Sequence, residues 1–100
     1  MTIKRLIKYS QNSDGAIMCP VCNFDYTHQG AIEIFERSED EKDGNHVKIL
    51  DDNIQVNRDL TGNPSPRRQG VTLEMKCESE HPFKLHIYQH KGQTFIETEH

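Results

Sequence analysis

Apolar and polar residues alternate along much of the second half of this 100-residue chain. In residues 71–77, VTLEMKC, the side chains of Val71, Leu73, Met75 and Cys77 fall on one side and the polar ones fall on the other. A period of two residues is typical of a strand with one buried face. Residues 71–77 are therefore predicted to form a β-strand with an apolar inner face.

The same alternation returns in residues 83–90, FKLHIYQH. Phe83, Leu85 and Ile87 are expected to face the core. The polar positions between and after them are expected to face outward, and they are Lys84, His86, Tyr88 and His90. Residues 93–99, QTFIETE, follow Lys91-Gly92 and are predicted to be the returning strand of a hairpin.

The first half of the chain contains three further segments rich in strand-forming residues. A tight hairpin turn at Asp51–Asn53 is predicted between the last two of these segments. Residues 60–70, LTGNPSPRRQG, hold two glycines and two prolines and are predicted to be a loop. Residues 3–9 alone have a pattern that fits a short helix, and it fits weakly. The three strand segments are residues 30–39, 46–50 and 53–57.

The composition indicates that the folded chain needs a stabilising link beyond its apolar core. Hydrophobic residues make up 33% of the sequence, charged residues make up 28%, and there is no tryptophan. Small domains with thin cores commonly add a metal ion or disulfides. The N-terminus does not resemble a secretory signal, so a reducing cytoplasmic location is expected. Three cysteines are also an odd number, which favours a metal over disulfides.

Residues 19–23, CPVCN, have the features of a zinc knuckle, a tight turn that presents two cysteine sulfurs to one ion. Cys19 and Cys22 are separated by two residues, and Pro20 fixes φ within the turn. The residue after the second cysteine must adopt a left-handed backbone conformation. Asn23 tolerates that conformation better than most residues other than glycine.

A structural zinc ion is almost always bound by four cysteine or histidine ligands. Cys77 and His81 lie four positions apart at the expected corner between two strands, where a second knuckle would stand. The separation of 54 residues between Cys22 and Cys77 does not prevent them from sharing one ion. A loop of that length costs only about 1 kcal/mol more to close than one of about 15 residues. Apparent zinc-binding energies reach about 10–16 kcal/mol. The predicted Cys₃His set for a structural Zn²⁺ is Cys19, Cys22, Cys77 and His81.

The sequence also allows several alternatives to this site. His28, His86 or His90 could replace His81, and His28 is the best of them because it lies six residues beyond Cys22. A redox-active dithiol at CPVC would need a helix starting at the first cysteine, and the following residues do not favour one. A catalytic zinc with an open position is less expected, because cysteine-rich sites are usually closed and structural.

These observations predict an all-β, or β-dominated, chain with zinc-ribbon-like antiparallel hairpins. One domain is expected over residues 1–100. Within it, residues 1–16 would be an N-terminal extension, and residues 38–70 would be an inserted hairpin and loop. No apolar run approaches the roughly 20 residues needed to span a bilayer, so no membrane association is expected.

Three blocks of the sequence resemble a family of small, uncharacterised zinc-ribbon proteins found in bacteriophage and bacterial genomes. The blocks are CPVCNFDYTHQGAIEIFER, GNPSPRRQGVTLEMKCE and LHIYQHKGQTFIE. The resemblance implies a zinc-ribbon fold with Cys19, Cys22 and Cys77 as ligands. It also implies a phage or prophage origin and hence a bacterial host cytosol. The chain departs from the family where a further cysteine is expected, and His81 stands nearby. The resemblance implies no activity.

The charge is uneven along the chain. Residues 33–59 carry nine acids against four bases, whereas residues 62–91 carry three acids against five bases. A basic surface for a macromolecular partner could include Arg67 and Arg68 in the proline-rich loop. In the alternative interpretation these arginines pair with nearby acids. The five candidate contact residues are Arg67, Arg68, Lys84, His90 and Lys91.

Two functional classes follow from this chemistry. In the first, the chain is a non-enzymatic binding module that acts on a protein of the host cell, which the acidic stretch favours. In the second, it binds single-stranded nucleic acid through the basic residues, with His86, Tyr88 and His90 stacking on bases. The net charge of −4 argues against broad binding to duplex nucleic acid. No nucleophile is tied to a base, so an enzyme is not expected.

Overall fold

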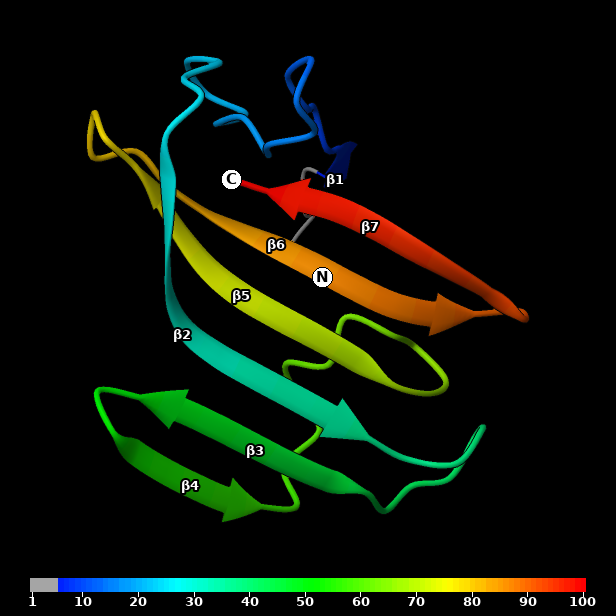
Figure 1. Ribbon diagram of the computed structural model, residues 1–100. Coiled ribbons are helices and arrows are strands. Elements are labelled where there is room, and N and C mark those ends of the chain that lie inside the picture. The colour runs from blue at the N-terminus through cyan, green and yellow to red at the C-terminus, as the bar shows by residue number, and fades with distance from the viewer. Residues whose placement is uncertain (1–5) are drawn as a thin grey trace.

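A computed structural model describes residues 6–100, which form one antiparallel sheet of seven strands with the order β1-β7-β6-β5-β2-β3-β4 (Figure 1). The predicted all-β class is confirmed. Residues 6–100 contain no helix long and apolar enough to cross a membrane. The strands are β1 Leu6–Lys8, β2 Thr27–Glu36, β3 Asn45–Leu50, β4 Asn53–Asn57, β5 Gly70–Cys77, β6 Pro82–His90 and β7 Gln93–Glu99.

The predicted segments agree closely with the strands of the C-terminal half. β5, β6 and β7 coincide with the alternating runs to within a residue at each end. The weakly predicted helix is wrong for residues 6–8, which form β1 and pair with β7 through Ile7 and Thr98. Residues 3–5 lie outside the described part of the chain. The three-residue strand forms because β7 offers a free edge, a long-range contact that local sequence does not encode.

Two hairpins are closed by two-residue turns with left-handed backbone. Asp51 and Asp52 have φ values of 49° and 68°, and Lys91 and Gly92 have 51° and 78°. Two consecutive residues with positive φ define the turn type whose twist matches that of the flanking strands. The predicted turns at Asp51–Asn53 and at Lys91-Gly92 are therefore confirmed.

One face of the sheet is lined by β-branched and leucine side chains in two rows that cross neighbouring strands. The strand register aligns Val56, Val47, Ile34, Val71, Ile87 and Ile96 in the first row. The second row continues the pattern on four of these strands with Ile54, Ile49, Ile32 and Leu73. We call these ten residues the apolar face.

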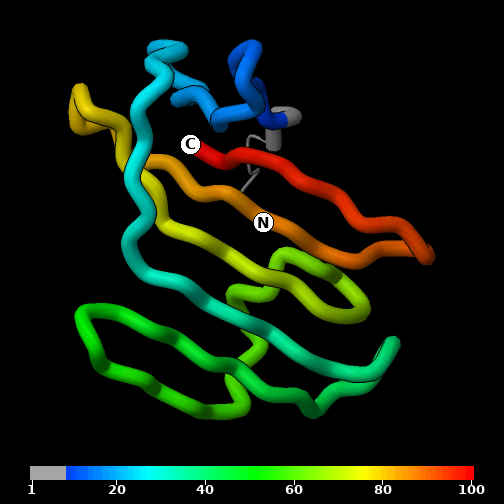
Figure 2. The backbone as a smooth tube through the Cα atoms, viewed as in Figure 1, coloured from blue at the N-terminus to red at the C-terminus, as the bar shows by residue number. Residues whose placement is uncertain are grey.

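The N-terminal segment, residues 9–26, covers the apolar side of the sheet at one end only. Tyr9 and Ile17 pack against the buried core there, which also receives Leu73. The buried cluster at this end consists of Cys19, Met75, Cys77, Phe83 and Leu85. In Figure 2 this segment lies on the opposite side of the molecule from the hairpin of β3 and β4. No buried apolar residue belongs to β3 or β4.

The loop that follows β4 packs on the opposite face of the sheet. Phe35, which alternates with Ile34 and so points to that face, lies 3.4 Å from the Cβ position of Gly62. Its ring also stacks on His46 at a centroid distance of 4.4 Å. A Cβ on Gly70 would lie 2.5 Å from Asn63 Oδ1, so only glycine permits this close approach. The predicted loop over residues 60–70 therefore packs against the sheet and does not extend freely into solvent.

The hairpin of β3 and β4 extends the sheet at one edge. β3 pairs with β2 through Ile34 and Val47, and β4 forms the outer edge. The hairpin therefore lies beside the central strands and does not cover their polar face. β2 in turn pairs with β5, with a register shift between Gln29 and Ile32.

Candidate metal centre

The CPVCN segment forms the predicted tight turn. The Asn23 N–H donates to the Cys19 carbonyl at 2.8 Å, and the Cys19 N–H donates to the Phe24 carbonyl at 3.0 Å. Asn23 has a φ of 61°, the left-handed conformation that the sequence predicted. The Val21 N–H points at the Cys19 sulfur at 3.4 Å. Both cysteines of the motif are thereby held at one corner.

A second turn stands at the corner between β5 and β6. Cys77 is the last residue of β5, and its N–H donates to the His81 carbonyl at 3.1 Å. The Glu80 N–H donates to the Cys77 carbonyl at 2.9 Å, and Glu80 has a φ of 70°. This turn is one residue shorter than the first, so the left-handed residue precedes the ligand position. The longer imidazole of His81 reaches the site from the following residue.

The two turns bring four potential ligand atoms together. The sulfurs of Cys19, Cys22 and Cys77 and a ring nitrogen of His81 all lie within 4.8 Å of one another. Cys22 Sγ lies 3.8 Å from Cys77 Sγ, and Cys77 Sγ lies 3.4 Å from His81 Nδ1. Zinc–sulfur and zinc–nitrogen bonds of about 2.3 Å and 2.05 Å at tetrahedral angles give edges of about 3.8 Å and 3.6 Å. The cluster can therefore hold a metal ion.

The local electrostatics favour a charged sulfur at Cys77. Burial by itself raises the pKa of Cys77, but hydrogen bonds outweigh it, chiefly from the backbone N–H groups of His81 and Ser79. The net result is a pKa of about 7. Burial and the neighbouring sulfurs of Cys19 and Cys77 raise the pKa of Cys22. A cation among the three sulfurs would relieve this crowding, because it stabilises every thiolate at once.

The cluster is continuous with the hydrophobic core. Cys19 and Cys77 are fully buried and belong to the core with Met75, Phe83 and Leu85, whereas Cys22 is exposed at the outer side. Because two of the four ligand positions are core residues, anything bound there also fixes the N-terminal segment on the sheet.

The other histidines that could supply the fourth ligand, His28, His86 and His90, do not belong to the cluster. His28 Nε2 pairs with Glu78 Oε2 at the surface. His86 contacts Thr72 and Glu99, and a buried ring nitrogen of His90, Nδ1, has no hydrogen-bond partner among the described residues. Within residues 6–100, His81 is the histidine that joins the three sulfurs.

His86 was predicted to face outward and therefore to be exposed. The predicted exposure is wrong, because the side chain is only 2% exposed. Its Nδ1 lies 2.9 Å from Thr72 Oγ1 and its Nε2 lies 2.6 Å from Glu99 Oε1. β6 lies between β5 and β7, so both neighbouring strands supply polar partners that enclose the ring. The expected stacking platform of His86, Tyr88 and His90 therefore lacks its first member, and Tyr88 itself stacks on Phe95 at 5.6 Å.

Of the two candidate arginines, Arg67 pairs with a nearby acid, as the alternative interpretation predicted. Arg67 makes a bidentate pair with Asp40, at 2.8 Å from Nε and 2.7 Å from Nη2. The hydrogen bonds from Arg67 hold the pKa of Asp40 below its usual value. Arg68 is exposed, and its carbonyl accepts hydrogen bonds from Arg37 and Asn63. The paired arginine thus serves the packing of the loop against the turn at Asp40.

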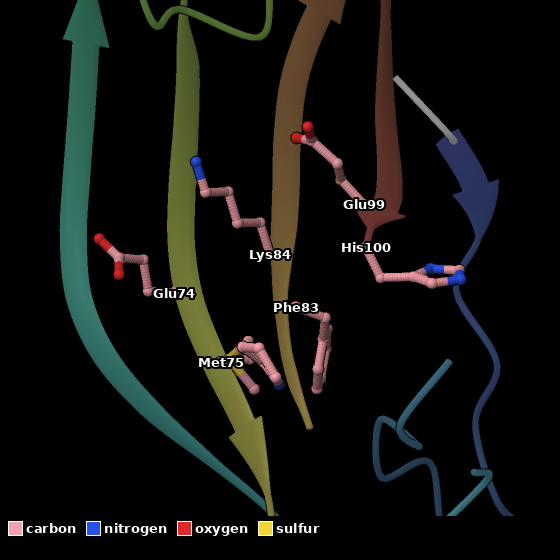
Figure 3. A pocket seen from close by; sticks show the side chains of 7 residues that line it. Glu74, Met75, Phe83, Lys84, Glu99 and His100 are labelled. Atoms are coloured by element: carbon pink, nitrogen blue, oxygen red, sulfur yellow. The ribbon is translucent and has the colours of Figure 1, made fainter. Parts of the chain in front are cut away.

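The remaining basic candidates are spread along β6. Lys84 is paired in register with Glu74 and Glu99. Figure 3 shows these three side chains beside a pocket of about 260 Å³ that Met75 and Phe83 also line. The turn that holds His90 and Lys91 closes the far end of β6. It lies roughly 30 Å, at strand spacing, from the end of the sheet where the four potential ligands meet, which we call the metal corner. The five basic candidates therefore do not form one patch beside the candidate metal site.

The feature that sequence reasoning missed is the apolar face. Alternation was present in IEI, VKI and IQV, and it placed these apolar residues on one side of each strand. No helix was predicted that could cover them, which is the signal that could have identified an open face.

No protein-family model, no curated protein and no solved structure matches this chain. The resemblance to zinc-ribbon proteins therefore remains an expectation, and the function is inferred below from the geometry of the molecule itself.

Proposed function

We propose that this chain is a small zinc-stabilised binding module that acts by contacting another protein and not by catalysing a reaction. The observation that carries the proposal is the cluster of Cys19, Cys22, Cys77 and His81, whose ligand atoms lie within 4.8 Å of one another. Three sulfurs and an imidazole are the ligands of structural zinc sites. Soft thiolates disfavour Mg²⁺ and Ca²⁺, which prefer oxygen ligands.

A closed site supports a structural role. Four protein ligands complete the tetrahedral coordination of zinc and leave no position for water or substrate. In this role the ion joins the N-terminal segment to the corner between β5 and β6. When bound, it replaces the apolar contacts that a larger core would provide.

The apolar face supports contact with a protein. Val56 and Ile54 are 68% and 67% exposed, and Ile34 and Ile96 are also among the exposed apolar residues. Contiguous exposed apolar surface of this kind marks a protein interface in soluble domains. The basic residues give the nucleic-acid alternative no comparable surface, because Arg67 is paired with Asp40 and Lys84 stands between two acids.

The proposal is tested by the metal content of ligand variants, measured by elemental analysis of protein purified without any chelator. We expect about one zinc per chain in the wild type, and loss of zinc with a poorly folded chain in Cys77→Ser. His81→Ala should weaken zinc binding at least tenfold, because a site with three ligands is left open to water.

His28→Ala is the matched control, because His28 is the nearest rival for the fourth position and pairs with Glu78 instead. It should keep a full complement of zinc. Equal zinc loss in His28→Ala and His81→Ala would contradict the ligand assignment. A wild-type chain without transition metal would contradict the proposal as a whole.

A further inference from the structure

The uncovered part of the sheet is unusually uniform in chemistry. In the first row of the apolar face, six neighbouring strands contribute Val56, Val47, Ile34, Val71, Ile87 and Ile96. These side chains are all β-branched and stiff at χ1, so burying them costs little conformational entropy. Neither row of the apolar face contains a charged residue.

Within residues 6–100, the segments outside the sheet cover only part of this face. The N-terminal segment packs on the core at Met75, Cys77, Phe83 and Leu85, near the metal corner. The packed loop after β4 lies on the other face, against Phe35. Every residue of β4 is exposed. A sheet with one apolar face is stable only when that face meets a second layer. Within residues 6–100, none of the six side chains of the first row belongs to the buried cluster beneath the N-terminal segment.

We infer that the second layer is another copy of this chain, so that two sheets pack face to face through their apolar faces in a homodimer. The inference rests on the proposed protein-binding function and names the protein that the face binds. Two sheets of identical twist stack well at about 10 Å and about −30°. A second copy is also present wherever the chain folds, which an unrelated partner is not.

The area of the face agrees with a dimer of moderate affinity. The first apolar row and one polar rim row cross six strands at about 4.8 Å spacing, and the second apolar row crosses four, so together they cover about 500 Å². Two copies would then bury about 1,000 Å² in total, the low end for a specific complex. The charge distribution does not oppose association. The chain carries a net charge of −4, but none of that charge lies on the apolar face.

The test is the molar mass of zinc-loaded full-length protein, measured by sedimentation equilibrium from about 1 to 500 μM, the range expected for a small interface. The mass should rise with concentration toward twice the chain mass of 11.6 kDa. A zinc-loaded wild type that stays at 11.6 kDa throughout overturns the dimer and leaves the proposed metal-stabilised module standing. A wild-type chain that is monomeric and also fails to bind zinc overturns the proposed function as well.

Val56→Lys and Gln55→Lys form a matched pair, because they are adjacent in β4 and point to opposite faces of the sheet. Both positions are already exposed, so neither lysine disturbs the monomer, and zinc content verifies the fold. Val56→Lys should weaken dimerisation at least tenfold, while Gln55→Lys should leave it unchanged. Equal effects of the two substitutions overturn the face-to-face arrangement in favour of pairing through the β4 edge.

Discussion

At the scale of single residues, a left-handed backbone conformation shapes each of the two turns of the candidate metal centre. Asn23 was expected to take a left-handed conformation after a cysteine pair, and it has a φ of 61°. Glu80 takes the same conformation without any local signal, because the shorter turn at Cys77 imposes it. His86 was assigned to the outer face by alternation, yet partners on two neighbouring strands enclose it. Alternation gives the direction of a side chain but not what lies beyond it.

The ion pair of Arg67 with Asp40 should make stability depend on acid pH. Hydrogen bonds from Arg67 lower the pKa of Asp40 from 3.8 in the folded state. A carboxyl with a lowered folded pKa stabilises the native state above its unfolded pKa, and this contribution disappears as the pH falls through the folded value. The difference in melting temperature between wild type and Asp40→Asn should therefore be greatest near neutral pH and shrink as the pH falls below the unfolded value of 3.8.

Asp43→Asn is the control for this measurement. It removes an exposed acid of the same turn that makes no ion pair with Arg67 among the described residues. Because acid also releases zinc from thiolates, only the difference between variants at each pH is informative. A difference that grows toward low pH contradicts the assignment.

At the scale of elements, strands with local alternation were predicted well and those that depend on distant partners were not. β5 and β6 carry their alternation in their own residues. β1 has three residues and exists through its pairing with β7, so its sequence suggested a helix. The position of the hairpin of β3 and β4 beside β2 likewise depends on a long-range pairing. Loop composition predicted residues 60–70 as irregular but could not predict that they pack on Phe35.

The hairpin turns offer a paired test of backbone strain. Asp52 has a φ of 68°, and Asp52→Gly should raise stability by about 0.5–1 kcal/mol, because glycine adopts this conformation without strain. Gly92 has a φ of 78°, and Gly92→Val should lower stability by about 1–2 kcal/mol. Thermal melting at fixed protein concentration measures both, with shifts of about 2–8 °C upward and more than that downward. Shifts of the same sign contradict this account.

At the scale of the whole molecule, the metal cluster could be predicted because ligand type and spacing constrain it, whereas the sheet order could not. Knuckle spacing singled out Cys19 and Cys22, and the odd cysteine count left Cys77 as their partner. Which strands are neighbours depends on contacts between distant residues, such as Ile32 of β2 and Leu73 of β5. The apolar face becomes visible only once that order aligns its rows.

Removal of the metal should abolish cooperative folding. Structural zinc contributes about 10–16 kcal/mol in small domains, which is similar to the total stability of about 5–15 kcal/mol that such domains have. Chelation should therefore leave a chain without a sharp thermal transition, measured by circular dichroism. One equivalent of Zn²⁺ should restore the transition, whereas excess Mg²⁺ should not. A sharp transition in fully zinc-free protein contradicts a structural role for the ion.

The position of the metal corner beside the junction of β2 and β5 has a consequence for folding speed. Cys22 and Cys77 are 55 positions apart, and the pairing of β2 with β5 begins immediately beside them at Thr27 and Cys77. Bringing such distant segments together is the slow step in forming a sheet of this kind. An ion that binds both turns early in folding would hold these ends of β2 and β5 together. The remaining residue pairs of the two strands could then form one after another from that end. Zinc would then act as a nucleus that sets the rate of folding.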